Sequence, residues 1–298
     1  MDLTDQITVS GRTVELHAAG SPDAEHCVVL LHAAPGGGSL DPDPRATEEA
    51  GVLLVGIDRP GYGGSTRFAA GTWPTVGEAA DDVVAVLDHL DRRSAAVAGW
   101  SAGGRVAVAA AARHPDRVQR VAVIGTPAPQ QDVPWVPADQ QQLVDDLATL
   151  PADQARAGLL EAMGQVFAGE HEPEWWLSSV ATEADAAVLD DAGHRARLAA
   201  SLDHGMGGGI AGMTDDVLAY CSQPWGFEPH QVGAPVLLLY GEDDALVGEP
   251  HGRWWEERLP HAELRLVPGV GHLVVVPAWA RALEHLVGRR PAGATAGR

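Results

Sequence analysis

Short apolar runs recur along this chain, separated by stretches of helix length. This spacing is typical of alternating β-strands and α-helices, with strands buried on both faces of a mostly parallel sheet. Helical periodicity marks the intervening segments 76–90, 102–113 and 277–287. The predicted strands are 13–18, at an edge of the sheet, and 27–32, 52–58, 95–99, 118–124, 235–240 and 263–267.

The pattern changes between residues 127 and 233. This block is polar and rich in Gln, Asp and Ala, with candidate helices at 140–150, 152–167, 183–200 and 213–221 but no convincing buried strand. An alternating pattern interrupted in this way predicts a sheet domain with a helical cap inserted late in the chain. The predicted units are a core of residues 1–126 and 234–290, a cap of 127–233 and a flexible tail of 291–298.

The charge balance restricts the possible partners. The chain has 41 Asp and Glu against 20 basic residues, a formal net charge of -21, and every basic residue is Arg. Such a surface repels phosphate backbones and anionic membranes, so we expect neither nucleic-acid nor membrane-surface binding. The absence of Lys excludes a catalytic Schiff base and a P-loop lysine.

Two further observations bear on the compartment. The first ten residues contain two aspartates and no apolar signal-peptide segment, and no apolar run reaches membrane-spanning length. The two cysteines, Cys27 and Cys221, are too few for a disulfide framework. We therefore expect a cytoplasmic protein that acts on a small-molecule substrate, and a homo-oligomer is possible.

The segment 99–103 (GWSAG) is a G-x-S-x-G sequence between a predicted strand and a predicted helix. On so tight a turn the serine is held in a strained conformation, and side chains at the flanking glycines would clash. The helix N-terminus also places positive partial charge where an oxyanion would develop. This context favours a nucleophilic Ser101, although a serine that merely caps the helix is the alternative reading.

Four other segments resemble the α/β-hydrolase superfamily, in the order that the family has them. They are 32–38 (HAAPGGG), 58–65 (DRPGYGGS), 241–244 (GEDD) and 269–272 (GVGH). The family usually carries His-Gly-x-Pro-Gly, Asp-x-Arg-Gly-x-Gly-x-Ser, an acid-bearing loop and a histidine-bearing loop at these places. The resemblance implies an α/β-hydrolase fold and a catalytic triad in the chain order Ser, acid, His.

The resemblance assigns Ser101 as nucleophile, His272 as general base and Asp244 as the acid that orients it. The neighbouring Asp243 is the alternative acid, but the family's Gly-x-x-Asp spacing selects Asp244. Some relatives place the acid after the sixth strand, where this chain reads Gly-Thr-Pro-Ala at 125–128, without a carboxylate.

The oxyanion hole implied by the resemblance uses the backbone N–H groups of Ala102 and Ala34. Ala33 stands where the family usually has Gly, and its methyl group narrows the conformations open to this loop. His32 is interpreted as a structural hydrogen bonder. Apolar residues of the cap and the turn are the predicted substrate pocket: Trp100, Met163, Phe167, Trp175, Trp176 and Met206.

The predicted activity is carboxylesterase-like, cleaving an ester, lactone or thioester of a small apolar substrate through an acyl-enzyme. No metal or organic cofactor is expected, because no His and Asp set has ligand spacing and the G-x-G-x-x-G at 207–212 follows no strand. Serine at the turn, in place of aspartate, argues against epoxide hydrolase and haloalkane dehalogenase chemistry.

Three alternatives stay open. The first is an aminopeptidase of the proline-iminopeptidase type, suggested by 35–38 (PGGG), with Glu172 and Glu174 as candidates to hold a free amine. The second is carbon–carbon bond hydrolysis by the same triad. The third is a non-catalytic small-molecule binding or accessory protein, because a fold does not fix a function.

Overall fold

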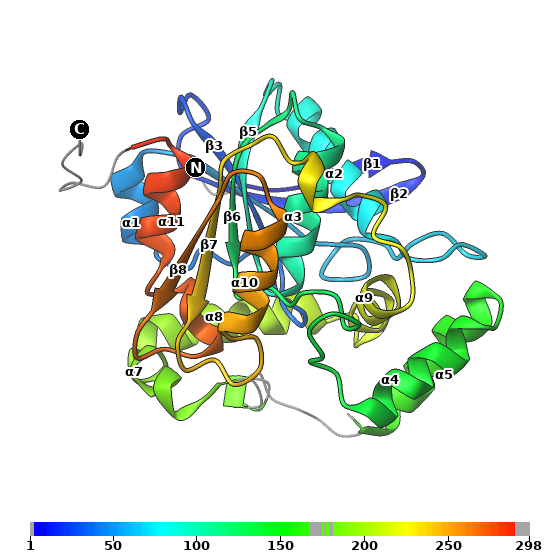
Figure 1. The fold of residues 1–298 in the computed structure, drawn as a ribbon. Helices are drawn as coiled ribbons and strands as arrows, with labels where there is room; N and C mark the ends of the chain where they lie inside the picture. Colours follow the sequence, from blue (N-terminus) through cyan, green and yellow to red (C-terminus); the bar gives the residue numbers. More distant parts are fainter. Residues whose placement is uncertain (1–2, 167–174, 176, 179–180, 290–298) are drawn as a thin grey trace.

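The computed structural model describes residues 3–166, 175, 177–178 and 181–289 (Figure 1). Within them, eight strands form one sheet in the order β1-β2-β4-β3-β5-β6-β7-β8. β1, β2 and β4 pair antiparallel, and all other neighbours pair parallel. The strands are β1 (Leu3–Val9), β2 (Arg12–Ala19), β3 (Cys27–Leu31), β4 (Leu53–Ile57), β5 (Ala95–Trp100), β6 (Val118–Ile124), β7 (Val236–Gly241) and β8 (Ala262–Val267).

The edge of the sheet differs from the prediction. The segment predicted as an edge strand is β2, which lies between β1 and β4. The edge is β1, whose residues alternate between half-buried and exposed. Polar residues occupy every second position of β1, so it lacks the continuous apolar run by which the interior strands were recognised.

Each central strand of the sheet contributes side chains to two hydrophobic clusters, one on each face of the sheet. In β3, Cys27, Val29 and Leu31 belong to one hydrophobic cluster, whereas Val28 and Leu30 belong to the other. This follows from the two-residue period of a strand, which sends successive side chains to opposite faces. A strand buried on both faces therefore needs an unbroken apolar run.

Helices cover both faces of the sheet. Residues of α2 (Val76–His89), α3 (Ala102–Arg113) and α10 (Glu249–Arg258) contribute to the first cluster, and those of α1 (Pro44–Ala50) and α11 (Trp279–Leu286) to the second. The sequence patterns did not predict α1 and α10. None of the described helices has the length and apolar character needed to cross a membrane.

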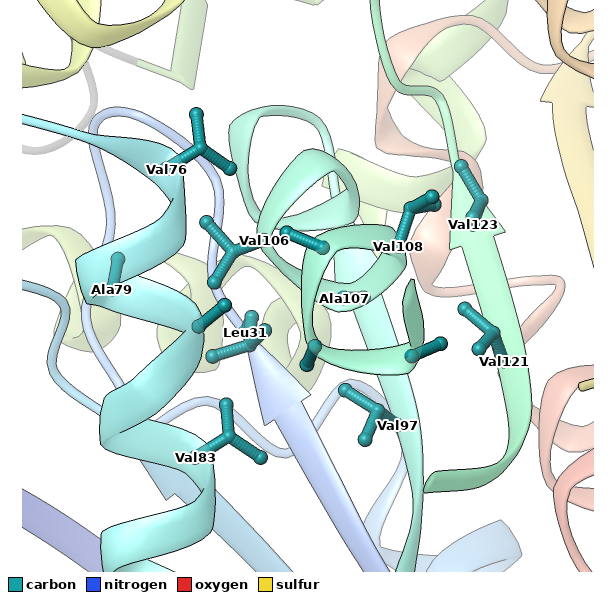
Figure 2. Packing of buried hydrophobic residues seen from close by; sticks show 14 of the residues in the cluster. Leu31, Val76, Ala79, Val83, Val97, Val106, Ala107, Val108, Val121 and Val123 are labelled. Carbon is teal, nitrogen blue, oxygen red and sulfur yellow. The ribbon is translucent and has the colours of Figure 1, made fainter. Parts of the chain in front are cut away.

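The packing of α3 on the sheet fixes the position of the turn before it. Figure 2 shows Val106 and Val108 of α3 beside Leu31, Val97 and Val121 of the strands below. All five are fully buried or nearly so, and burial of each such side chain contributes about 1.5–3 kcal/mol. The start of α3, and with it Ser101, is thereby held against the sheet.

The helices of the described part of the cap segment, residues 127–233, gather at one end of the sheet, and the last residues of the segment run back to the other end, where β7 begins (Figure 1). The segment predicted as one helix at 183–200 is divided, because Asp191 is extended and caps a new helix by accepting the N–H of His194 at 2.8 Å. The helices are α4 (Ala138–Ala148), α5 (Ala152–Val166), α7 (Ala186–Asp190), α8 (Ala192–Met206) and α9 (Ala211–Cys221), with 3-10 turns at Glu183–Asp185 and Pro229–Gln231.

Buried ion pairs attach α9 to the core. Asp215 is fully buried and accepts hydrogen bonds from both Arg67 and Arg156 at 2.6–3.0 Å. Its neighbour Asp216 pairs with Arg59, in the loop after β4. Removing one partner of a buried pair leaves an uncompensated charge, so Arg59 and Arg67 of the core hold α9 in place, and Arg156 ties α9 to α5.

Candidate active site

The two loops that carry the predicted nucleophile and oxyanion donor lie side by side. β3 is hydrogen-bonded to β4 on one side and to β5 on the other. The chain continues from β3 to β4 on one side and from β5 to β6 on the other side. The loops that follow β3 and β5 therefore leave the sheet in opposite directions. In open α/β sheets ligands bind in such a crevice, beyond the carboxyl ends of the strands.

The turn at Ser101 has the strained geometry that its sequence predicts. Ser101 adopts φ 52° and ψ -119°, a positive φ that side chains rarely tolerate. A Cβ at Gly99 would collide with the backbone of Gly103 and Gly104, and one at Gly103 would collide with the carbonyl of Leu31. Only glycine at these positions lets the helix begin so close to the sheet.

Ser101, His272 and Asp244 form one hydrogen-bonded line. His272 Nε2 lies 3.1 Å from Ser101 Oγ, and His272 Nδ1 lies 2.8 Å from Asp244 Oδ2. All three residues are buried, with exposed fractions of 9%, 3% and 7%. The neighbouring Asp243 is exposed, so the structure brings Asp244, the acid selected by the loop spacing, to the histidine.

The environment of Asp244 favours its ionised form. Burial alone would raise the pKa of this carboxyl, but the hydrogen bond to His272 and two backbone N–H groups hold the pKa below its ordinary value. Those N–H groups belong to Leu246 and Val247 and donate to Oδ1 at 2.9 and 2.8 Å. An ionised Asp244 keeps the proton of His272 on Nδ1 and leaves Nε2 free to accept a proton from Ser101.

Two residues that the sequence analysis did not assign to the histidine loop hold it in place. Trp100 Nε1 donates to the carbonyl of His272 at 3.1 Å. Asp185, fully buried in the cap segment, accepts the N–H groups of Gly271 and Leu273 at 2.9 and 3.1 Å. The sequence signal for Asp185 is a capping box with Thr182, which indicates a helix start but not this second role.

The peptide group between Ala33 and Ala34 has a fixed orientation. The carbonyl of Ala33 accepts from His32 Nδ1 at 2.6 Å and from Arg59 Nη2 at 3.1 Å. In a trans peptide the N–H points opposite to the carbonyl, so the Ala34 N–H points away from these two donors. Both Ala33 and Ala34 line the cavity above Ser101, and the methyl group of Ala33 is accommodated.

His32 is neutral in this arrangement. Burial, followed by the nearby charge of Arg59, lowers the pKa of His32 to about 3. Its Nε2 accepts the backbone N–H of Arg59 at 3.1 Å, which leaves the proton on Nδ1 for the carbonyl of Ala33. His32 therefore joins the loop after β3 to the loop after β4.

The triad opens into a cavity of about 260 Å³. Of the six predicted pocket residues, Trp100 and Met163 line it. Met206, partly buried against the second hydrophobic cluster, does not line the cavity, and neither does Trp175, which is 41% exposed. Phe167 and Trp176 lie outside the described residues. The cap segment's apolar lining residues are Trp135, Met163, Leu177, Leu198, Leu202, Met213 and Val217.

One buried cation, Arg105, also lines the cavity and was not predicted. It is 1% exposed, and its Nε donates to the carbonyl of Pro127 at 3.1 Å. Its guanidinium lies over the rings of Trp135, Tyr220 and Trp225, with Cζ 4.4–5.2 Å from the ring centroids. Burial lowers the pKa of Arg105. The sequence signal was an arginine in the first turns of an alanine-rich helix, four positions after Ser101.

The only carboxylate among the described lining residues other than the triad is that of Asp216. Its Oδ1 accepts from Arg59, and its Oδ2 accepts from the hydroxyl of Tyr62 at 2.6 Å. Both oxygens are thus engaged within the protein. Among the lining residues that the structure describes, the cavity offers a ligand apolar walls and the cation of Arg105, and no carboxylate with a free oxygen.

Comparison with known proteins places the chain in a family. A family model described as alpha/beta hydrolase fold matches residues 27–277. The chain belongs to the α/β-hydrolase family. The expected fold is thereby confirmed, and the chain is a hydrolase of this family.

Two relatives are similar to this chain over most of its length. A putative carbamate hydrolase from Caulobacter sp. is 28% identical over 91% of this chain and 92% of its own. A pimeloyl-[acyl-carrier protein] methyl ester esterase from Chromobacterium violaceum is 31% identical over 72% and 75%. A hydrolase structure from Pseudomonas aeruginosa superposes with a TM-score of 0.68 at 21% identity, covering 96% and 98% of the two chains, which supports the fold alone.

Proposed function

We propose that this protein is a serine hydrolase that cleaves an ester, lactone or thioester bond of a small, largely apolar substrate. The observation that carries the proposal is the line of hydrogen bonds from Ser101 through His272 to Asp244 at the base of the cavity. A serine hydroxyl is a weak nucleophile unless a base removes its proton, and this geometry provides that base.

In the first half of the reaction, Ser101 Oγ attacks the carbonyl carbon while its proton passes to His272 Nε2. The developing oxyanion accepts hydrogen bonds from the N–H groups of Ala102 and Ala34. Ala102 is the first residue of α3, where backbone N–H groups have no intrahelical acceptor and the helix dipole is favourable. His272 then protonates the leaving group, and the acyl group stays on Ser101.

In the second half, His272 accepts a proton from a water molecule that attacks the acyl-enzyme. Collapse of the second tetrahedral intermediate releases the acid and returns the proton to Ser101. Ionised Asp244 stabilises the imidazolium form of His272 in both halves. Removing one oxyanion-hole donor from a serine hydrolase lowers the turnover number about 10²–10³-fold.

The cavity supports an apolar acyl group or ring as the substrate. Its cap-derived walls are mostly aliphatic or aromatic, and its volume of about 260 Å³ suits a small molecule. The names of the relatives are consistent with an esterase, and the carbamate hydrolase, similar over most of this chain, makes a carbamate the second candidate.

The same cavity argues against a proline iminopeptidase. Such an enzyme needs acidic groups for a free α-amine, and the candidates Glu172 and Glu174 lie outside the described residues. Among the described lining residues, Asp216 is already bound by Arg59 and Tyr62, and Arg105 would repel a cation. We therefore rank amine-bearing substrates below neutral esters.

The proposal is tested by labelling the protein with a fluorophosphonate and measuring its intact mass. We expect one adduct on the wild type and on Ser39→Ala, which removes an exposed serine, and none on Ser101→Ala. A panel of matched acyl esters, thioesters, lactones, carbamates and prolyl amides then ranks the bond classes. Labelling that persists in Ser101→Ala would contradict the proposed nucleophile. A folded wild type that takes no label and turns over no substrate would favour the non-catalytic binding protein.

A further inference from the structure

Four side chains with metal-binding atoms meet where the sheet contacts the cap segment. Glu15 and His17 come from β2, Asp58 follows β4, and His204 lies near the end of α8. One ligand atom from each lies within 4.8 Å of the other three. We call these four residues the junction cluster. None of them lines the cavity above Ser101.

The distances within the junction cluster approach those of a tetrahedral metal site. His17 Nε2 lies 3.4 Å from Asp58 Oδ2 and 3.6 Å from Glu15 Oε1, and His204 Nε2 lies 3.2 Å from Glu15 Oε1. Ligands bound at 2.0–2.2 Å in a tetrahedron stand about 3.3–3.6 Å apart. All six distances are within 4.8 Å, and one of them, 2.7 Å from His204 Nε2 to Asp58 Oδ2, is a hydrogen bond that must lengthen to admit an ion.

The ligands are oriented by a second set of contacts. In metalloproteins the atoms of a ligand that do not touch the metal are usually hydrogen-bonded, which fixes the orientation of the ligand. Three of the four residues have such a contact. The contacts are Gln6 Nε2 to Glu15 Oε2 (2.7 Å), the Gly38 N–H to Asp58 Oδ1 (2.6 Å) and Thr4 Oγ1 with His17 Nδ1 (3.2 Å).

The charge and burial of the junction cluster also suit a cation. Asp58 is fully buried and Glu15 is 7% exposed, so two carboxylates lie close together with little solvent. Burial alone would raise the pKa of Asp58, but hydrogen bonds from His17 and His204 lower it, and the carboxylate is ionised. The side chain of His204 is 32% exposed, which gives an ion a path from solvent.

We propose that the junction cluster binds one divalent transition-metal ion, for which zinc is the best match, and that this ion fastens α8 of the cap segment to the sheet. Two imidazoles and two carboxylates are a common donor set for zinc and its neighbours. Because four protein ligands complete a tetrahedron, the ion has no open position for substrate. Its role is structural.

The test begins with the chain of 298 residues, without a histidine tag, dialysed against a chelator. Zinc chloride is titrated near pH 8, because the hydrogen bond to Asp58 raises the pKa of His204 and a proton competes with the metal. We expect one zinc per chain with a Kd on the order of micromolar or tighter, and a rise in Tm of roughly 5 °C at saturation. Cobalt in place of zinc should give the visible spectrum of a tetrahedral complex.

Variants separate this site from the other histidines. His204→Gln and Glu15→Gln should each weaken zinc binding about 100-fold or more, and Gln6→Ala, which removes a supporting contact, about 10-fold. His194→Gln is the matched control, since it removes a histidine of the same helix that lies outside the junction cluster and should bind zinc as the wild type does. Circular dichroism establishes that each variant is folded.

Three outcomes would overturn the proposal. They are no stoichiometric zinc uptake by the folded wild type, uptake that survives in both ligand variants, and a cobalt spectrum typical of octahedral coordination. The first would mean that the junction cluster is a hydrogen-bonded ion-pair network that needs no metal. Fluorophosphonate labelling of Ser101 reports on the proposed function separately, so either proposal can fail alone.

Discussion

Asp244 of the core and two buried aspartates of the cap segment are held by their partners in different ways. In the core, Asp244 takes two of its hydrogen bonds from backbone groups two and three residues further along. In the cap segment, Asp185 and Asp215 are fully buried and reach partners 59 to 148 positions away in the chain, and Asp185 also closes a local capping box. The core therefore positions its acid by local turns, whereas the cap depends on tertiary docking.

This difference separates two kinds of contribution to catalysis. The proposed reacting groups, Ser101, His272 and Asp244, belong to the core. The cap segment supplies most of the apolar wall and, through Asp185, two hydrogen bonds to the histidine loop. Substitution of a proposed reacting group in the core should therefore abolish turnover. Substitution of a supporting residue in the cap segment should lower turnover by misplacing those groups.

The largest effect is expected for Asp244→Asn. The amide cannot hold the proton of His272 on Nδ1 as the carboxylate does, and a comparable change in serine hydrolases lowers the turnover number about 10⁴-fold. The measurement is steady-state hydrolysis of the best ester from the panel. Asp243→Asn, which changes the adjacent exposed aspartate, should stay within about threefold of wild type. Equal losses in the two variants would contradict the choice of Asp244.

A smaller effect is expected for Asp185→Ala in the cap segment. Without the carboxylate, the N–H groups of Gly271 and Leu273 lose their acceptor, and a misplaced His272 should lower kcat about 10- to 100-fold with little change in KM. Asp185→Asn keeps one acceptor oxygen and should recover part of the activity. The matched control is Asp203→Ala, on the exposed face of α8. A loss confined to KM would mean that Asp185 shapes the cavity and does not position the histidine.

The smallest effect is expected for the pH dependence of stability. It involves His251, which contacts the chain at Ala128, just after β6, where the cap segment begins. His251 of α10 accepts the N–H of Ala128 at 3.1 Å, and burial lowers the pKa of His251 from 6.5 to about 4. Between these pH values the unfolded chain binds a proton at His251 that the folded chain does not. The free energy of unfolding should therefore fall as the pH drops through this window, by at most about 1.4 kcal/mol per pH unit from this group.

Urea unfolding at several pH values measures this contribution. His251→Gln should flatten the decline between pH 6.5 and about 4, while His261→Gln, at an exposed position, should leave the slope of the wild type unchanged. If both variants follow the wild-type curve, the buried His251 is not a source of acid sensitivity.

The sequence predicted the interior strands of the core and three of the four cap helices, but it missed β1, α1 and α10 in the core and one helix break in the cap segment. The strands β3 to β8 were predicted to within one or two residues, because an apolar run buried on both faces is a local signal. β1 lacked that signal, and its absence led to the wrong edge. In the cap segment, the break at Asp191 was missed because an aspartate inside a helical pattern can be a surface residue or an N-cap.

Some residues of the candidate site could be predicted from local sequence motifs, and others could not. Ser101, His272 and Asp244 were predicted from loop motifs, and the structure brings them together. Asp185 and the junction cluster could not be predicted from spacing, because their partners come from segments that meet only when the cap docks on the sheet. The pocket residues were predicted from composition alone. For the same reason, two of them, Trp100 and Met163, line the cavity, whereas Trp175 and Met206 do not.

The ion pairs that attach α9 also bear on the order in which the chain is made. Arg59 and Arg67 lie 157 and 148 positions before their partners Asp216 and Asp215. During synthesis from the N-terminus, these two arginines are therefore made 157 and 148 residues before the carboxylates that will neutralise them. Because burying an unpaired arginine is unfavourable, Arg59 has to remain in water until α9 arrives. The cavity above Ser101, which α9 helps to line, therefore cannot be completed before residues 211–221 have been synthesised.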